Sequence, residues 1–328
     1  MQKDTLFAMA STTKPVVGVA IMMMMEEGKL QLTDPVSKFI PEFKTMKVAV
    51  TKEGSSEVEL VPANREITIR DLLTHTSGLG TGGKGSSSVP PEVLRVGPDD
   101  TLETFAKRAA TVPLDFQPGT LWRYSGLVGI EVLSRIVEIT SGLTLDQFFK
   151  QRIFEPLGMK DTYFVVPEDR KDRIATIYQG DGKQLTKSQF RLTFPKSYFS
   201  GSAGLYSTAE DFFRFAQMLL NKGEFNGHRL LSPRAVELYS SNHVGEMMPG
   251  QLGRPKGMGF GLTVEVMQDS AMAGIYRSNG SFGWDGAFGT YFCVDPKEQV
   301  VSVLMIQLPG GQFMHRPFET SVLQAIVD

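Results

Sequence analysis

The chain has 328 residues, of which 41% are hydrophobic and 21% charged, enough to bury the core of one large domain or two smaller ones. Its 34 Lys and Arg against 36 Asp and Glu leave a formal charge of −2 with no block of like charge, which argues against nucleic-acid binding and a polybasic membrane anchor. The single cysteine excludes an internal disulfide, and the four histidines show no metal-ligand spacing, so neither a metal nor a cofactor is expected.

The first predicted element is a buried helix from Ser11 to Glu27, which begins at a hydroxyl residue and stops at Gly28. Its apolar stretch is shorter than the roughly 20 residues that a bilayer span needs, so no membrane span is expected. The first residues lack the charged-then-apolar layout of a secretory signal. The sequence as it stands therefore predicts a cytoplasmic protein, and a periplasmic or secreted one if a further segment precedes it.

Helical signals dominate the middle of the chain. Thr-x-x-Asp capping patterns at Thr68 and Thr208 each predict the start of a helix. A third helix is expected after Tyr124, with an apolar stripe that ends near Gly142. We read such stripes as core-facing surface rather than as cofactor sites.

After Gly257 the hydrophobic pattern changes to that of strands. A three-stranded antiparallel meander is predicted, with a turn at Asp295 to Glu298 and strands at Phe260–Val266, Gly286–Val294 and Val300–Leu308. A short helix from Arg316 is expected to close the chain, packing Phe318, Val322 and Ile326 on the sheet. The fold class is thus α+β, a mixed α/β protein. Residues 1–29 and 257–328 are expected to form a sheet-containing domain that carries the first helix, and residues 30–256 a mostly helical one.

The chain offers one plausible nucleophile motif. It contains no Gly-x-Ser-x-Gly, and Ser11 to Lys14 is its only Ser-x-x-Lys. With Ser11 in the first helical turn, Lys14 lies on the same face, where burial would lower its pKa toward that of a usable base. The N–H groups at the helix start could stabilise an oxyanion. An N-cap serine followed by a solvated lysine is the alternative reading of such a motif.

The surroundings favour the catalytic reading. The segment from Asp4 to Pro15 resembles the nucleophile segment of the serine β-lactamase and penicillin-binding-protein superfamily, in its class C-like branch and closest to the family VIII carboxylesterases. Further segments resemble the same family in the same order, at residues 69–79, 116–119 leading to Tyr124 and Ser125, 154–162, 203–211 and 283–290. The resemblance covers nearly the whole chain, and it implies a β-lactamase/transpeptidase-like fold, with an antiparallel sheet flanked by helices.

The resemblance also implies roles for individual residues. Ser11 would be the nucleophile, Lys14 its proton acceptor, and Tyr124 a second base whose phenolate character Lys14 maintains. The oxyanion hole would be the backbone N–H groups of Ser11 and Ala287. In this pattern His75 is a structural residue of its loop. The substrate-binding residues would be Trp284, Asp285, Gly286, Ser125 and Gly126.

Two departures from the family pattern bear on the substrate. Where β-lactamases carry Tyr-x-Asn, Gly126 offers no amide, and where they carry a lysine in Lys-Thr-Gly, Trp284 and Asp285 offer an indole and an anion. We therefore expect a serine hydrolase that cleaves small to medium carboxylic esters, with β-lactam cleavage at most a side activity. The alternatives are a β-lactamase, D-amino-acid peptidase or transacylase on the same scaffold, or a catalytically silent ligand-binding protein.

A third departure concerns the sheet. In the family, strands precede the nucleophile helix, whereas only ten residues precede Ser11 here. Those strands are expected to be missing, which would leave an exposed sheet edge. Either the sequence given is shortened or a second copy of the chain covers that edge, so the predicted partners are a small-molecule ester and, in the second case, another protomer.

Overall fold

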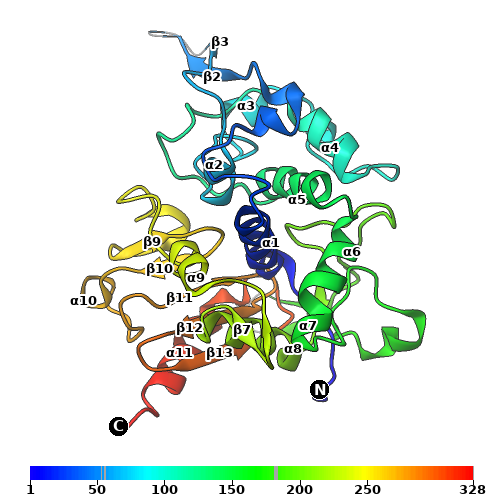
Figure 1. Cartoon of the computed structure of the whole chain (residues 1–328), viewed down its shortest axis with the longest axis vertical. Helices are drawn as coiled ribbons and strands as arrows, with labels where there is room; N and C mark the ends of the chain where they lie inside the picture. The colour runs from blue at the N-terminus through cyan, green and yellow to red at the C-terminus, as the bar shows by residue number, and fades with distance from the viewer. Residues whose placement is uncertain (53, 55–56, 181–183, 328) are drawn as a thin grey trace.

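A five-stranded antiparallel sheet forms one side of the molecule, with the strands in the order β13-β12-β11-β10-β9 (Figure 1). The computed structural model describes residues 1–52, 54, 57–180 and 184–327. The strands of the large sheet are β9 (Met258–Phe260), β10 (Glu265–Met267), β11 (Phe282–Asp285), β12 (Tyr291–Asp295) and β13 (Val300–Leu304). Small two-stranded pairs are formed by β1 (Phe7–Ala8) with β6 (Tyr206–Ser207), β2 (Lys47–Thr51) with β3 (Val58–Pro62), β4 (Tyr178–Gly180) with β5 (Leu185–Lys187), and β7 (Glu224–Phe225) with β8 (His228–Arg229).

The predicted antiparallel meander is present, but it has five strands instead of three, and the bounds of its strands differ from the prediction. The segment predicted as one strand, Phe260–Val266, is the turn of the β9–β10 hairpin with parts of both strands. Thr263 has a φ of +74° in that turn, and its N–H donates to the Leu73 carbonyl at 3.0 Å. Every residue of the turn is buried, and its apolar positions therefore follow the same alternating pattern as those of a strand. The residues before Gly286, predicted as no strand, form β11, and the following residues form the turn to β12.

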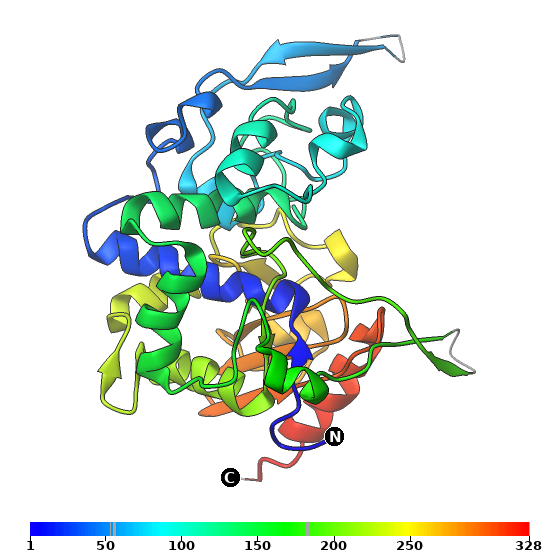
Figure 2. The same cartoon turned by 90° about the vertical axis from the view of Figure 1, so that its right-hand side faces the viewer.

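Helix α1 (Lys14–Glu26) runs through the middle of the molecule, between the sheet on one side and a group of helices on the other (Figures 1 and 2). It packs against α5 and α9, and its residues from Lys14 to Met24 are all buried. The other helices are α2 (Ile69–Leu73), α3 (Lys84–Ser87), α4 (Leu102–Ala109), α5 (Val128–Ser141), α6 (Leu145–Phe149), α7 (Glu155–Leu157), α8 (Ala209–Leu220), α9 (Pro233–Tyr239), α10 (Ser270–Ala273) and α11 (His315–Leu323). The mixed α/β fold is confirmed.

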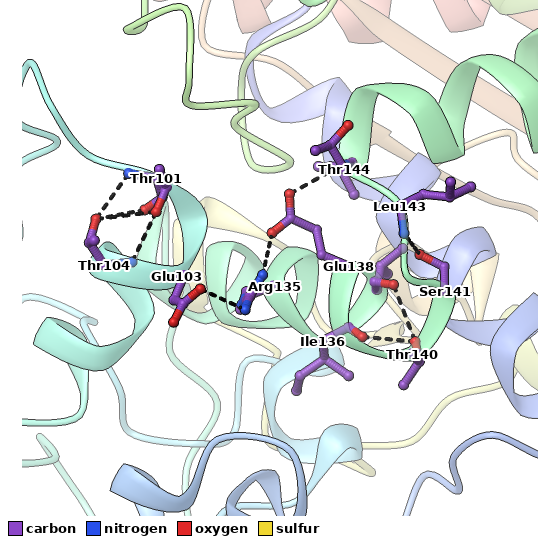
Figure 3. A network of polar contacts seen from close by, with 12 residues as sticks. Thr101, Glu103, Thr104, Arg135, Ile136, Glu138, Thr140, Ser141, Leu143 and Thr144 are labelled. Atoms are coloured by element: carbon purple, nitrogen blue, oxygen red, sulfur yellow. Dashed lines mark hydrogen bonds and ion pairs between the residues drawn. The ribbon is translucent and has the colours of Figure 1, made fainter.

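The predicted caps position the helices near the nucleophile. Thr68 caps α2 by accepting from the Asp71 N–H, and the Asp71 side chain accepts in return from the Thr68 N–H at 2.8 Å. Helix α5 ends at Gly142 in the left-handed conformation, as predicted. An ion pair of 2.9 Å from Arg135 on α5 to Glu103 holds α4 against α5 (Figure 3).

The expected division of the chain into two domains, at residues 30 and 257, stays a proposal. Helix α8 packs with the other domain than the one to which this division assigns it. Although α8 falls within 30–256, it packs against β12 and β13 and so covers one face of the sheet. Its buried face carries Phe212 and Phe215, whose rings lie 5.3 and 6.4 Å from the ring of Phe292 on β12. The sheet side of the molecule therefore draws on the middle of the chain as well.

The edge of the sheet at β13 is only partly covered. Strand β13 is an edge strand whose five residues are only half-buried. The closing helix α11 packs against it, and Phe318, Val322 and Ile326 are half-buried. In the part of the chain that the structure describes, no helix combines the length and the apolar character of a membrane span.

Candidate active site

Ser11 lies in a tight turn just before α1. The predicted helix from Ser11 begins as a 3-10 turn, Ala10–Thr13, and the α-helix proper starts at Lys14. Ala10 has a φ of +47°, a conformation rare for residues other than glycine. Thr290 holds this turn against the sheet, because its hydroxyl bonds to the Met9 carbonyl at 2.9 Å and to the Thr12 hydroxyl at 2.8 Å.

Lys14 reaches the nucleophile from the first turn of α1. Its Nζ lies 3.0 Å from Ser11 Oγ and donates to the Ser202 carbonyl at 2.8 Å. The side chain is fully buried, and burial lowers the pKa of Lys14 to about 7, with the charges of Glu131 and Asp285 opposing the shift. An amine that is half neutral near pH 7 can accept the proton of the Ser11 hydroxyl.

Tyr124 approaches Ser11 and Lys14 from the loop before α5. Lys14 Nζ lies 5.2 Å from the centre of its ring. Its hydroxyl is buried and makes no hydrogen bond of good geometry within the described residues. Burial raises the pKa of Tyr124 far above its usual value, although the Ser11 hydroxyl and the Trp284 indole act in the opposite direction. Burial thus favours the neutral phenol of Tyr124, and the phenolate role that the family resemblance implies stays a prediction.

His75 holds the backbone on both sides of Tyr124. Its carbonyl accepts from the Arg123 N–H at 3.1 Å, and its Nδ1 accepts from the Ser125 N–H at 3.3 Å. The imidazole packs edge-on against the Tyr124 ring at 4.7 Å, and its φ of +58° places it between these two neighbours. Burial keeps the pKa of His75 well below its usual value, so Nδ1 stays free to accept. His75 was expected to be a structural residue, but no sequence motif predicts its hydrogen bond with the Ser125 N–H, because the two residues are 50 positions apart.

The end of β11 brings Ala287 beside the nucleophile turn. Gly286 fits only as glycine, because a Cβ there would lie 2.4 Å from the Met9 carbonyl oxygen and 2.2 Å from Thr290 Oγ1. The Gly286 carbonyl accepts from the Gly289 N–H at 2.8 Å and from the Gln312 side chain at 3.2 Å. In a trans peptide the N–H points away from the carbonyl, so the Ala287 N–H is turned from these donors, and its role as an oxyanion donor stays a prediction.

Asp285, which the sequence predicts as an anion at the substrate site, is ion-paired. Arg254 Nη2 lies 2.6 Å from its carboxylate, and the guanidinium sits 5.5 Å from the Trp284 ring. Trp284 is buried, and no acceptor for its indole N–H is found within the described residues. Arg254 was missed from the sequence because it lies 31 residues before its partner, in a loop without a motif.

Ser125 and Gly126 differ in what they offer a substrate. The Ser125 hydroxyl is buried at the start of α5, where it accepts from the Gly129 N–H at 3.0 Å. Gly126 is exposed beside Tyr124, and a Cβ there would lie 3.9 Å from that ring. The Ser125 hydroxyl therefore has a structural partner, and the predicted substrate contacts of both residues stay predictions.

Comparison with known proteins agrees with this geometry. The family model described as Beta-lactamase matches residues 1–324. The chain belongs to the Beta-lactamase family. An uncharacterized protein of Mycobacterium tuberculosis is 38% identical over 322 residues, which cover 94% of this chain and 78% of that protein. Esterase EstB of Burkholderia gladioli is 30% identical over 99% of this chain and 83% of its own length.

The solved structures include a hydrolase with a similar fold. EstCE1, described as a hydrolase with promiscuous acyltransferase activity, aligns with a TM-score of 0.80 and 26% identity over 98% of this chain and 85% of its own. The family and these relatives confirm the expected fold and the esterase-like branch of the scaffold. The chain is therefore a serine hydrolase of the esterase-like branch.

Proposed function

We propose that this serine hydrolase cleaves small to medium carboxylic esters through an acyl-enzyme on Ser11. The observation that carries the proposal is the 3.0 Å contact between Ser11 Oγ and a fully buried Lys14 amine whose pKa is lowered to about 7. A hydroxyl becomes a nucleophile when a positioned base can take its proton in the transition state.

In the acylation step, neutral Lys14 takes the proton of the Ser11 hydroxyl while Oγ bonds to the ester carbonyl carbon. The backbone N–H groups of Ser11 and Ala287 hold the developing oxyanion. The ester C–O bond then breaks, and the leaving oxygen takes the proton of the neutral Tyr124 hydroxyl. The Lys14 ammonium returns a proton to Tyr124, so the net transfer is from Ser11 to the leaving alcohol.

Deacylation uses the same groups in reverse. Neutral Lys14 accepts a proton from a water molecule that attacks the acyl carbon, and Ser11 Oγ leaves as it regains a proton. The neutral phenol of Tyr124 suits a group that donates a proton to an oxygen and takes one back. The carboxylic acid is then released, and the free hydroxyl is restored.

The preference for neutral esters is supported by the groups around Tyr124. Gly126 carries no amide for an acylamide side chain, and Trp284 presents an indole where a carboxylate-binding lysine is expected in a β-lactamase. The positive charge of Arg254 is paired with Asp285 and also with Glu265, at 2.7 Å. Arg254, the charged group at this end of the site, is therefore already paired and is less able to bind a carboxylate on the substrate.

The test compares wild type with Ser11→Ala on p-nitrophenyl esters of increasing chain length and on nitrocefin. We expect butyrate-sized esters to be turned over far faster than nitrocefin, with an acyl adduct visible by intact mass only when Ser11 is present. Ester turnover that survives Ser11→Ala would refute the assignment, and faster nitrocefin turnover would favour a β-lactamase.

Acyl transfer is a second activity that one relative favours. EstCE1 is described as a hydrolase with promiscuous acyltransferase activity, and an alcohol can replace water in the second step without any change in the catalytic groups. Product analysis in the presence of an added alcohol distinguishes the two, because a transferase forms a new ester where a hydrolase forms only acid.

The expected homo-oligomer stays a prediction. The half-buried edge strand β13 is the surface that a second copy would cover. Light scattering on the purified chain tests it, since a monomer at all concentrations would contradict this assembly.

A further inference from the structure

A fully buried carboxylate lies behind Lys14. Glu131 sits in the first turn of α5, seven residues after Tyr124, with no exposed surface. It accepts hydrogen bonds from the Ser202 hydroxyl at 2.7 Å, from the Gly201 N–H at 3.1 Å, and from the Ser200 hydroxyl. Within the described residues no Lys or Arg lies at ion-pair distance from it. Burying a carboxylate costs free energy unless its oxygens accept hydrogen bonds, so the presence of Glu131 at this place needs an explanation.

The donors to Glu131 belong to the same turn that holds Lys14. The carbonyl of Ser202 accepts from Lys14 Nζ at 2.8 Å. The turn is pressed between two helices, because a Cβ at Gly201 would lie 2.0 Å from Ser134 Oγ on α5 and 2.7 Å from Val17 on α1. Glu131 therefore fixes the turn, and the turn fixes the amine that contacts Ser11.

The other titratable groups around Lys14 are already accounted for. Asp285 on β11 is ion-paired with Arg254. Tyr124 from the loop before α5 and His75 from the loop after α2 are both neutral by burial. Glu131, from α5, is the first of the charges that oppose the effect of burial on the pKa of Lys14.

We propose that Glu131 is a positioning residue, which holds the Ser200–Ser202 turn against Lys14 and tunes the proton affinity of the amine through its charge. The inference rests on the proposed role of Lys14 as the base. Burial raises the pKa of Glu131 to about 7, so the carboxylate is partly charged at that pH and fully charged above it. Its negative charge favours the ammonium form of Lys14, and without it burial would lower the pKa of Lys14 further. The amine would then become neutral at a lower pH and would be a weaker base.

The test replaces the charge and keeps the shape. In Glu131→Gln, we expect the acid limb of kcat/KM for p-nitrophenyl butyrate, followed from about pH 5 to about pH 9, to move down by about one pH unit. The plateau value should fall, because the weaker base transfers the proton less readily. The fold is checked by circular dichroism and the melting temperature.

Glu138→Gln is the matched control on the same helix. Glu138 lies two turns further along α5, at 3.1 Å from Arg135, which also pairs with Glu103 of α4 (Figure 3). The same substitution there removes a carboxylate of α5 without touching the turn at Ser202. Its acid limb should coincide with that of wild type.

The outcomes separate the inference from the proposed function. A folded Glu131→Gln with an unchanged acid limb overturns the role of Glu131, while Ser11-dependent ester turnover still supports the hydrolase. If Glu131→Gln fails to fold, Ser202→Ala decides. It keeps the carbonyl that holds Lys14 but removes one donor to Glu131, so the carboxylate binds a proton more readily and the acid limb must also move down. An unchanged limb in that variant overturns the inference too.

Discussion

Two clusters of largely buried side chains near the active site behave differently. The lysine cluster consists of Ser11, Lys14 and Glu131. The arginine cluster consists of Arg254, Glu265, Arg277 and Glu319. In the arginine cluster the charges touch, with Arg277 and Arg254 at 2.6 and 2.7 Å from Glu265. In the lysine cluster the amine bonds to a hydroxyl and a carbonyl, and no carboxylate of the described residues lies at ion-pair distance from it.

The pKa values follow from that difference. Burial works against the charge of Glu265, yet Arg254 and Arg277 hold its pKa below the usual value. Burial lowers the pKa of Lys14 to about 7, and it raises the pKa of Glu131 to about 7 against the opposing effect of the Ser200 and Ser202 hydroxyls. Contacting ion pairs give fixed charges, which stabilise a structure but cannot exchange protons near neutral pH. A buried amine without a contacting carboxylate can exchange a proton near neutral pH. Such a group is therefore typical of a catalytic site.

The largest expected effect comes from removing the amine. Lys14→Met should lower kcat/KM for p-nitrophenyl butyrate by about 1,000-fold, because the base is lost. The melting temperature should not fall, since a buried group whose charge is disfavoured is replaced by an apolar one of similar length. A variant that loses stability together with activity would show that Lys14 is a structural residue.

The matching change in the arginine cluster should do the reverse. Arg277→Met leaves Glu265 and Glu319 without this partner and should lower the free energy of unfolding by about 3 kcal/mol or more. The kcat per folded molecule should stay close to wild type. Urea unfolding and active-site titration with a fluorophosphonate probe measure the two quantities separately. A stable but inactive Arg277→Met would contradict the contrast between the clusters.

Tyr124→Phe tests the hydroxyl while it keeps the ring. The ring packs against His75 and against Trp284, at 4.7 and 5.5 Å, so the fold and KM should change little. We expect kcat to fall by about 100-fold, the contribution of a positioned proton donor. A kcat within a few-fold of wild type would remove Tyr124 from the mechanism.

His75 offers a smaller effect with a rescue. His75→Ala removes the acceptor for the Ser125 N–H, and kcat should fall about tenfold, as for the loss of one buried hydrogen bond. His75→Asn should recover most of that loss, because its side-chain oxygen can accept in the place of Nδ1 and Asn tolerates a φ of +58°. Equal losses in both variants would show that the ring, rather than the acceptor, positions Tyr124.

The sequence could predict those contacts of the site that join residues close together in the chain. Ser11 and Lys14 lie three residues apart, so their contact follows from one turn of backbone. Tyr124 and Ala287 came from the family resemblance, since no local pattern joins them to Ser11. Glu131 was missed because it sits beside Ile130 within an apolar stripe, where a single acidic residue looks like an interruption.

The fold shows the same limit. The caps at Thr68 and Thr208 and the stop at Gly142 depend on neighbouring residues, and all three are confirmed. The β9–β10 hairpin was predicted as one strand because its turn is as apolar as a strand. The turn is buried by segments distant in the sequence, including Leu73, whose carbonyl accepts from the Thr263 N–H. Long-range packing decides burial, and periodicity alone cannot show it.

The smallest expected effect concerns the ion pair between Arg254 of the arginine cluster and Asp285. Arg254 and Asp285 are partly exposed, with 22% and 16% of their side-chain surface accessible, so the pair should be worth little. Asp285→Asn should change kcat/KM for a neutral ester by less than about fivefold. The same variant leaves Arg254 with one carboxylate partner fewer and should favour an ester that carries a carboxylate, such as p-nitrophenyl hemisuccinate. The ratio of the two substrates is the measurement, and an unchanged ratio would mean that Arg254 does not face the substrate.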